Sequence, residues 1–166
     1  MNKSILIAIL FFGIHTLQAQ ERPISPFEAF VGSSWVSEGL QLGGFEGKTV
    51  YEFEWGLNRQ IIHVKTYTTD PQTRKFGLRN EGVRAFNNET ENLEFYEFDK
   101  LGGITKGKIA IEGRNIHYEY EYQGLQLRDS WIHVSDDEYN FIAGTWDGTS
   151  WSKKFHETTI VRAATD

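Results

Sequence analysis

The stretch Phe30-Val31-Gly32-Ser33-Ser34-Trp35 joins a short helical segment to the first of a long series of strands. Before it, Ser25 is a residue type that caps helices, Pro26 suits a first helical turn, and Glu28 is an acidic residue near the helix start. Gly32 is a typical helix stop, and from Trp35 onward the pattern changes to alternation with a period of two. The stretch therefore predicts a short N-terminal helix that leads into a β-domain.

The rest of the chain reads as strands. Aromatic residues make up 14% of the sequence, and pairs of turn-forming residues separate alternating segments. The predicted strands cover residues 34–40, 48–55, 60–68, 77–86, 92–98, 105–112, 115–122, 125–134, 139–146 and 151–162.

Short turns between successive strands predict an antiparallel up-and-down order. About ten such strands close into a barrel or flatten into a sandwich, and we favour the barrel because closure removes the exposed sheet edges. With 166 residues and no linker-like tract, the chain is expected to form one domain over residues 20–166.

The N-terminus has the layout of a secretory signal peptide over residues 1–19. Lys3 precedes an apolar run from Ile5 to Ile14, and the small residue Ala19 follows. That run is too short to span a bilayer stably, and no later stretch is apolar enough to act as a membrane anchor. We therefore expect a soluble protein exported to the periplasm or the medium, whose stability comes from core packing because it has no cysteine.

Charge and motifs exclude several functions. The formal net charge of −6 argues against binding to a nucleic-acid backbone. The sequence has no Gly-x-Ser-x-Gly elbow, P-loop, dinucleotide-binding glycine motif or cysteine nucleophile. Its histidines show no metal-binding spacing, so no metal or other cofactor is predicted.

The two ends of the β-region are expected to meet. In an up-and-down barrel the last strand, which ends at Arg162, lies beside the first strand, which begins near Trp35. A guanidinium over the indole face would then stabilise the barrel end that the helix covers. We assign Trp35 and Arg162 a structural role.

These end motifs resemble the calycin superfamily, which includes lipocalins, fatty-acid-binding proteins and nitrobindin-type barrels. In that superfamily a Gly-x-Trp element opens the first strand and a basic residue of the last strand packs on the Trp. This chain has two residues, Ser33 and Ser34, between Gly32 and Trp35. It is most similar to small exported barrels of uncharacterised function, and the resemblance implies a fold without implying a substrate.

A barrel of ten strands is generally too wide for side chains alone to fill, so we predict an interior site for a small, largely apolar ligand. The stretch Tyr118-Glu119-Tyr120-Glu121-Tyr122 alternates strictly, which puts three rings on one face and two carboxylates on the other. An interior arginine would suit a ligand that carries a carboxylate. The predicted lining residues are Arg84, Tyr118, Tyr120, Arg128 and Trp131.

Three alternatives remain open from the sequence. A nitrobindin-like haem protein would use His156, which stands six residues before Arg162, as its axial ligand. An enzyme would use an interior acid–base pair. A structural or interaction module would have a filled interior. The candidate groups for the enzyme are Glu54, Glu81, Glu97 and Asp129, with Arg84 or Arg128.

Overall fold

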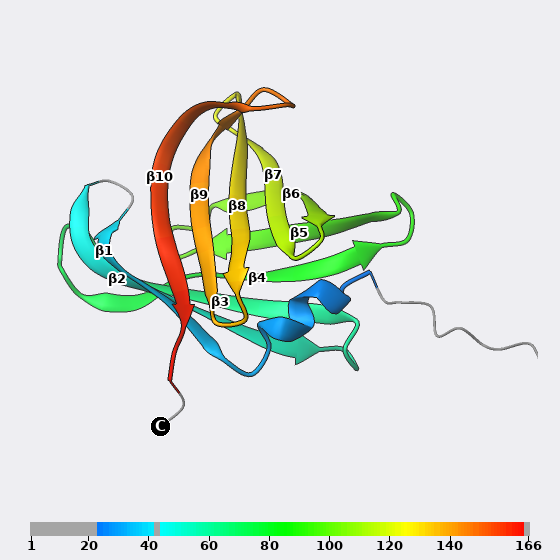
Figure 1. Ribbon diagram of the computed structural model, residues 1–166, viewed down its shortest axis with the longest axis horizontal. Coiled ribbons are helices and arrows are strands. Elements are labelled where there is room, and N and C mark those ends of the chain that lie inside the picture. Colours follow the sequence, from blue (N-terminus) through cyan, green and yellow to red (C-terminus); the bar gives the residue numbers. More distant parts are fainter. Residues whose placement is uncertain (1–22, 42–43, 165–166) are drawn as a thin grey trace, which may run out of the picture.

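The computed structural model describes residues 23–41 and 44–164, so the predicted signal peptide lies outside the described residues. Figure 1 shows a short helix followed by strands that curve around a common interior. The elements are η1 (Ser25–Ala29), β1 (Ser34–Gln41), β2 (Phe45–Gly56), β3 (Ile61–Thr69), β4 (Phe76–Asn87), β5 (Asn92–Asp99), β6 (Ile104–Glu112), β7 (Asn115–Tyr122), β8 (Leu125–Ser135), β9 (Glu138–Trp146) and β10 (Trp151–Arg162).

The strands form a closed antiparallel barrel in which each strand pairs with its neighbours in sequence and β10 pairs with β1. The predicted all-β, up-and-down barrel is therefore confirmed. Each predicted strand overlaps its observed counterpart, and the largest shift is the start of β2, at Phe45 where Lys48 was expected. The fold is compatible with the calycin type.

The seam that closes the barrel is short. β1 and β10 are paired at Trp35 with Arg162 and at Val36 with Val161, whereas β1 is paired with β2 along its whole length. Figure 1 shows β1 and β10 diverging beyond this seam. The closure therefore depends on the residues at one end of the barrel.

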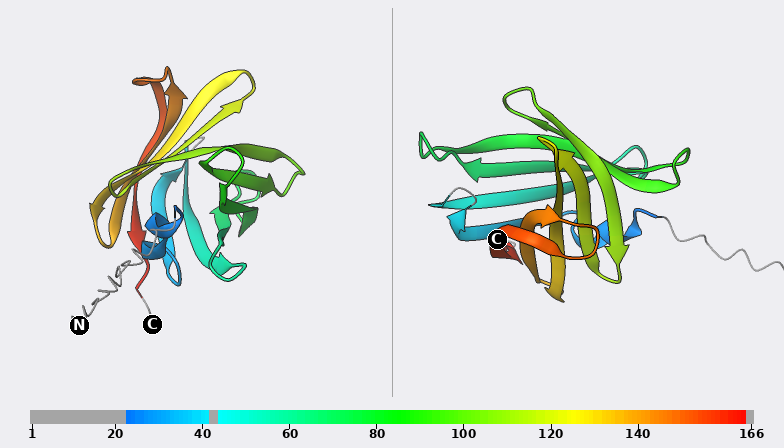
Figure 2. Two further views of the ribbon diagram at one scale, coloured as in Figure 1. Left: turned by 90° about the vertical axis from the view of Figure 1, so that its right-hand side faces the viewer. Right: turned by 90° about the horizontal axis from the view of Figure 1, so that it is seen from above.

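The helix η1 lies at that end of the barrel, as Figure 2 shows. It is a single segment of 3₁₀-helix with Pro26 in its first turn, and Phe27 is fully buried. The prediction that Ser25 caps the helix is wrong, because the N-cap position is Ile24 and no side chain caps the helix by a hydrogen bond. Among the described residues, no helix has the length and apolar character needed to cross a membrane.

Phe30, which follows η1, is the centre of an aromatic cluster that fills this end of the barrel. Its ring centroid lies 5.0 Å from that of Trp35, 4.9 Å from Tyr139, 5.1 Å from Phe53 and 5.4 Å from Trp131. These five side chains are all buried. Close-packed rings of this kind contribute both their buried apolar area and favourable edge-to-face contacts, so this end is a solid core.

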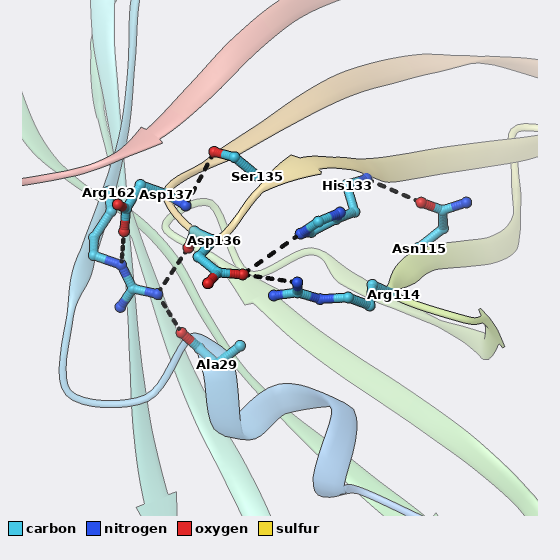
Figure 3. Close-up of polar contacts among 8 residues, drawn as sticks. All are labelled: Ala29, Arg114, Asn115, His133, Ser135, Asp136, Asp137 and Arg162. Carbon is cyan, nitrogen blue, oxygen red and sulfur yellow. Dashed lines mark hydrogen bonds and ion pairs between the residues drawn. The ribbon is translucent and has the colours of Figure 1, made fainter.

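Arg162 connects the last strand to the plug, and Figure 3 shows part of its network. Its guanidinium carbon lies 4.6 Å from the ring centroid of Trp35, as the sequence predicts. The same group donates hydrogen bonds to Ser33 Oγ at 2.7 Å, to the Ala29 carbonyl at 3.0 Å and to Asp137 Oδ1 at 2.8 Å. One side chain thus joins β10, the end of η1 and the β8–β9 turn.

Candidate ligand-binding cavity

The barrel interior beyond the aromatic plug holds a cavity of about 740 Å³. It opens at the end away from η1, where the β3–β4 and β5–β6 loops contribute Asp70 to Gln72 and Asp99 to Leu101 to its wall. Its volume lies within the range of about 300–1,000 Å³ that small-molecule sites usually occupy. The deeper lining residues are Tyr51, Phe53, Val64, Thr66, Asn80, Arg84, Phe95, Glu97, Tyr118, Tyr120, Leu127, Asp129, Trp131, Phe141, Ala143 and His156.

Aromatic rings form the floor and one side of the cavity. The Trp131 ring is packed edge-on against Tyr51, with centroids 4.9 Å apart, and against Phe141, at 6.3 Å. Trp131 and Phe141 are directly opposite each other on β8 and β9. This wall offers apolar surface and π-faces to a guest molecule.

A second side of the cavity is polar and centres on Arg84. Its guanidinium forms an ion pair with Glu97 at 2.5 Å, and its Nε donates a hydrogen bond to the Tyr118 hydroxyl at 3.4 Å. Asn80 donates to the other oxygen of Glu97 at 2.8 Å. Because Arg84 is buried and already paired, its charge is matched within the protein, and a ligand carboxylate would have to compete with Glu97.

Asp129 is a second carboxyl group deep in the cavity. It accepts a hydrogen bond from the Tyr120 hydroxyl at 3.2 Å, and in the described part of the chain no cationic nitrogen lies within 4.0 Å of it. The pKa of Asp129 is raised to about 7, mainly because the side chain is buried. The charge of Glu97 also raises it, whereas the hydrogen bond from Tyr120 and the charge of Arg79 lower it. Near neutral pH the carboxyl therefore exists in both protonation states.

Two tyrosines supply neutral hydroxyls to the same space. Burial is the main cause that raises the pKa of Tyr51, and the charges of Asp129 and Glu97 add to it. Burial also raises the pKa of Tyr118, although Arg84 opposes this effect. Because the Tyr118 oxygen accepts a hydrogen bond from Arg84, its own proton is left to donate elsewhere, and both hydroxyls are hydrogen-bond donors toward the cavity at neutral pH.

Four of the five predicted lining residues, Arg84, Tyr118, Tyr120 and Trp131, line the cavity, and their role in binding a ligand stays a prediction. The fifth, Arg128, is not part of the cavity wall. Leu127 and Asp129 face inward, so the alternation of β8 places Arg128 on the outer face. There its guanidinium carbon lies 4.2 Å from the Trp146 ring centroid.

His156 also lies on the cavity wall. Its ring centroid is 6.0 Å from that of Phe141, and burial lowers its pKa, so the imidazole is neutral at neutral pH. Of the other described histidines, His117 faces the outside of the barrel and is in hydrogen-bond contact with Ser130 at 2.8 Å. His63 and His133 are not part of the cavity wall.

The carboxylates predicted as acid–base candidates also divide into residues of the cavity wall and residues outside it. Glu97 and Asp129 face the cavity, whereas Glu54 and Glu81 are exposed and are not part of its wall. The sequence prediction did not include Tyr51 and Phe141 among the lining residues. Strand parity is the signal that points to both, because Tyr51 shares a face with the buried Phe53, and Phe141 shares one with the buried Tyr139.

Within the described residues no group of three or more metal-ligating side chains is present. Comparison of the chain with known protein families finds no family that matches, and comparison with curated proteins finds no match either.

Proposed function

We propose that this protein is an exported barrel that binds one small, largely apolar molecule in its interior. The observation that carries the proposal is the cavity of about 740 Å³, which combines an aromatic wall with a few inward-facing polar groups. Sites for small molecules usually have this composition, in which apolar surface supplies affinity and a few polar groups orient the ligand. Export rests on the signal-like segment of residues 1–19.

The cavity argues against a purely structural module. Such a module would fill its interior with side chains, as this barrel does around Phe30 at its closed end. Above Trp131 the inward positions instead include small residues such as Thr66 and Ala143. The contrast between a solid end and a hollow end supports a role for the hollow.

Filling the cavity is expected to weaken binding. Ala143 is buried, lies on the cavity wall and is paired with Asp129 on β8 and His156 on β10, so a larger side chain there projects into the centre of the space. We expect Ala143→Trp to lower the affinity for the neutral fluorescent dye Nile red by at least about tenfold, and Ala143→Leu to lower it less. Dye fluorescence measures the affinity.

The matched control is Val134→Leu, because Val134 is 50% exposed, is not part of the cavity wall and changes side-chain size outside the barrel. This variant should bind the dye as the wild type does. Melting curves establish that the Ala143 variants are folded, and Ala143→Leu serves if the larger residue prevents folding. Folded Ala143 variants that bind the dye unchanged, or a wild type that does not bind it, would show that the cavity is not a ligand site.

Haem is the cofactor alternative, and the residues of the cavity fit it poorly. His156 supplies one imidazole, but Asp129 lies in the same row of the wall, two strands away, and its ionised form would repel a propionate. Addition of hemin should therefore give no Soret band that depends on His156. A band that His156→Ala removes would establish the haem alternative instead.

A further inference from the structure

We propose that the ligand carries an ammonium group and that Asp129 is its counter-ion. This inference rests on the proposed function, because it assigns the chemical class of the molecule held in the same cavity. It replaces the sequence expectation of a ligand carboxylate. Three features of the cavity support it: the balance of its charges, the rings around Asp129 and the space beside that residue.

The charges deep in the cavity leave one carboxylate without a cation. Arg84 and Glu97 neutralise each other at 2.5 Å, whereas the one polar contact of Asp129 in the described part of the chain is the Tyr120 hydroxyl. The other arginine and lysine of the cavity wall, Arg79 and Lys100, lie at its mouth. Lys100 is paired with Asp70 at 2.7 Å, and Arg79 is exposed to solvent, which screens its charge. An ionised Asp129 therefore favours a cationic guest.

Aromatic residues occupy the neighbouring inward positions of the wall that holds this carboxylate. Tyr118 is directly opposite Asp129 on β7, and Trp131 is the next inward residue on β8. Phe141 faces Trp131 from β9, and Tyr51 contacts Trp131 from β2. The negative faces of such rings attract organic cations, and rings combined with a carboxylate are a known way to recognise an ammonium group.

The wall beside Asp129 leaves room for that group. The neighbours in the same row are Ala143 on β9 and then His156 on β10, so a small side chain separates the carboxylate from the imidazole. Burial lowers the pKa of His156, which keeps it uncharged at neutral pH. The imidazole therefore neither pairs with Asp129 nor repels a guest cation.

Three congeners with one apolar body test the charge preference: phenylbutylammonium, phenylbutanol and phenylbutanoate. Calorimetric titration at pH 8 should show that the ammonium ion binds at least about tenfold more tightly than the alcohol and that the carboxylate binds most weakly. Because the pKa of Asp129 is about 7 and an alkylammonium stays charged, lowering the pH to 6 should weaken the ammonium complex about tenfold. Binding of the alcohol should change little.

Asp129→Asn keeps the shape of the side chain and removes its charge. This variant should bind the ammonium ion and the alcohol with equal affinity, and its affinities should no longer depend on pH between 6 and 8. The matched control is Glu119→Gln, which removes a charge from the neighbouring strand β7 on the outer face, where Glu119 lies 3.6 Å from Arg128. It should keep the wild-type preference.

The outcomes separate this inference from the proposed function. If the alcohol binds and the ammonium ion has no advantage, or if Asp129→Asn retains that advantage, the assignment of Asp129 is wrong while the cavity remains a ligand site. If phenylbutanoate binds most tightly, the ligand pairs with Arg84 or Arg79 instead of with Asp129. If none of the three binds and the Ala143 series also leaves dye binding unchanged, the proposed function fails with the inference.

Discussion

Asp129→Asn is expected to make the protein more stable at pH 8, by about 2–4 kcal/mol in the free energy of unfolding. In the folded protein the pKa of the Asp129 carboxyl is about 7, whereas its ordinary value is 3.8. Between about pH 4 and pH 7 the unfolded chain therefore ionises this carboxyl while the folded protein keeps it protonated, so stability falls progressively as the pH rises through this range. An asparagine has no charge to bury and still accepts the hydrogen bond from Tyr120.

The measurement is denaturant unfolding of both proteins from pH 4 to pH 8. The difference between them should be smallest at pH 4, where the unfolded chain also keeps much of its Asp129 protonated, and should grow until the pH passes about 7. Glu119→Gln, an outer-face change of the same charge, should not show this growth. Parallel pH profiles for wild type and Asp129→Asn would contradict the environment described for Asp129. A stability gain that accompanies loss of ammonium binding is typical of a functional residue.

Phe30→Ala is expected to destabilise the barrel by about 3–5 kcal/mol, because it removes the ring at the centre of the aromatic plug. Phe30 is 1% exposed and packs against rings from β1, β2, β8 and β9. The short seam between β1 and β10 lies at the same end, so the backbone pairing that closes the barrel there is limited. Thermal unfolding should show a melting temperature lower by about 10 °C.

Phe98→Ala is the matched control for this substitution. Phe98 is 51% exposed at the end of β5, so the same loss of atoms should change the free energy of unfolding by less than about 0.5 kcal/mol. Equal effects at the two positions would mean that the plug does not stabilise the barrel.

The sequence predicts the fold well because two local signals agree. Alternation identifies each strand, and the turn residues between strands determine an up-and-down order. The contact between Trp35 and Arg162 then follows from topology alone, although the two residues lie at opposite ends of the β-region.

The site is predicted less well from the sequence. Alternate residues of a strand face opposite sides of the sheet, so the inward face of each strand has to be known before its lining residues can be named. Along β7, the three tyrosines share a face and all line the cavity. β8 carries apolar and charged residues on both faces, so its inward face is ambiguous from sequence. Arg128 and Trp131 are three residues apart and cannot share a face of a regular strand, and Asp129, not Arg128, lines the cavity with Trp131. The pairing of Arg84 with Glu97 depends on the register of β4 and β5, which composition does not determine.

If the hollow half of the barrel holds an organic guest, bound phenylbutanol should give intermolecular nuclear Overhauser effects with the aromatic protons of the isotope-labelled protein. We expect contacts from the phenyl ring to Tyr51, Trp131 and Phe141, which line the cavity. Contacts confined to exposed residues such as Phe98 and Ile104, or no contacts at all, would contradict this expectation.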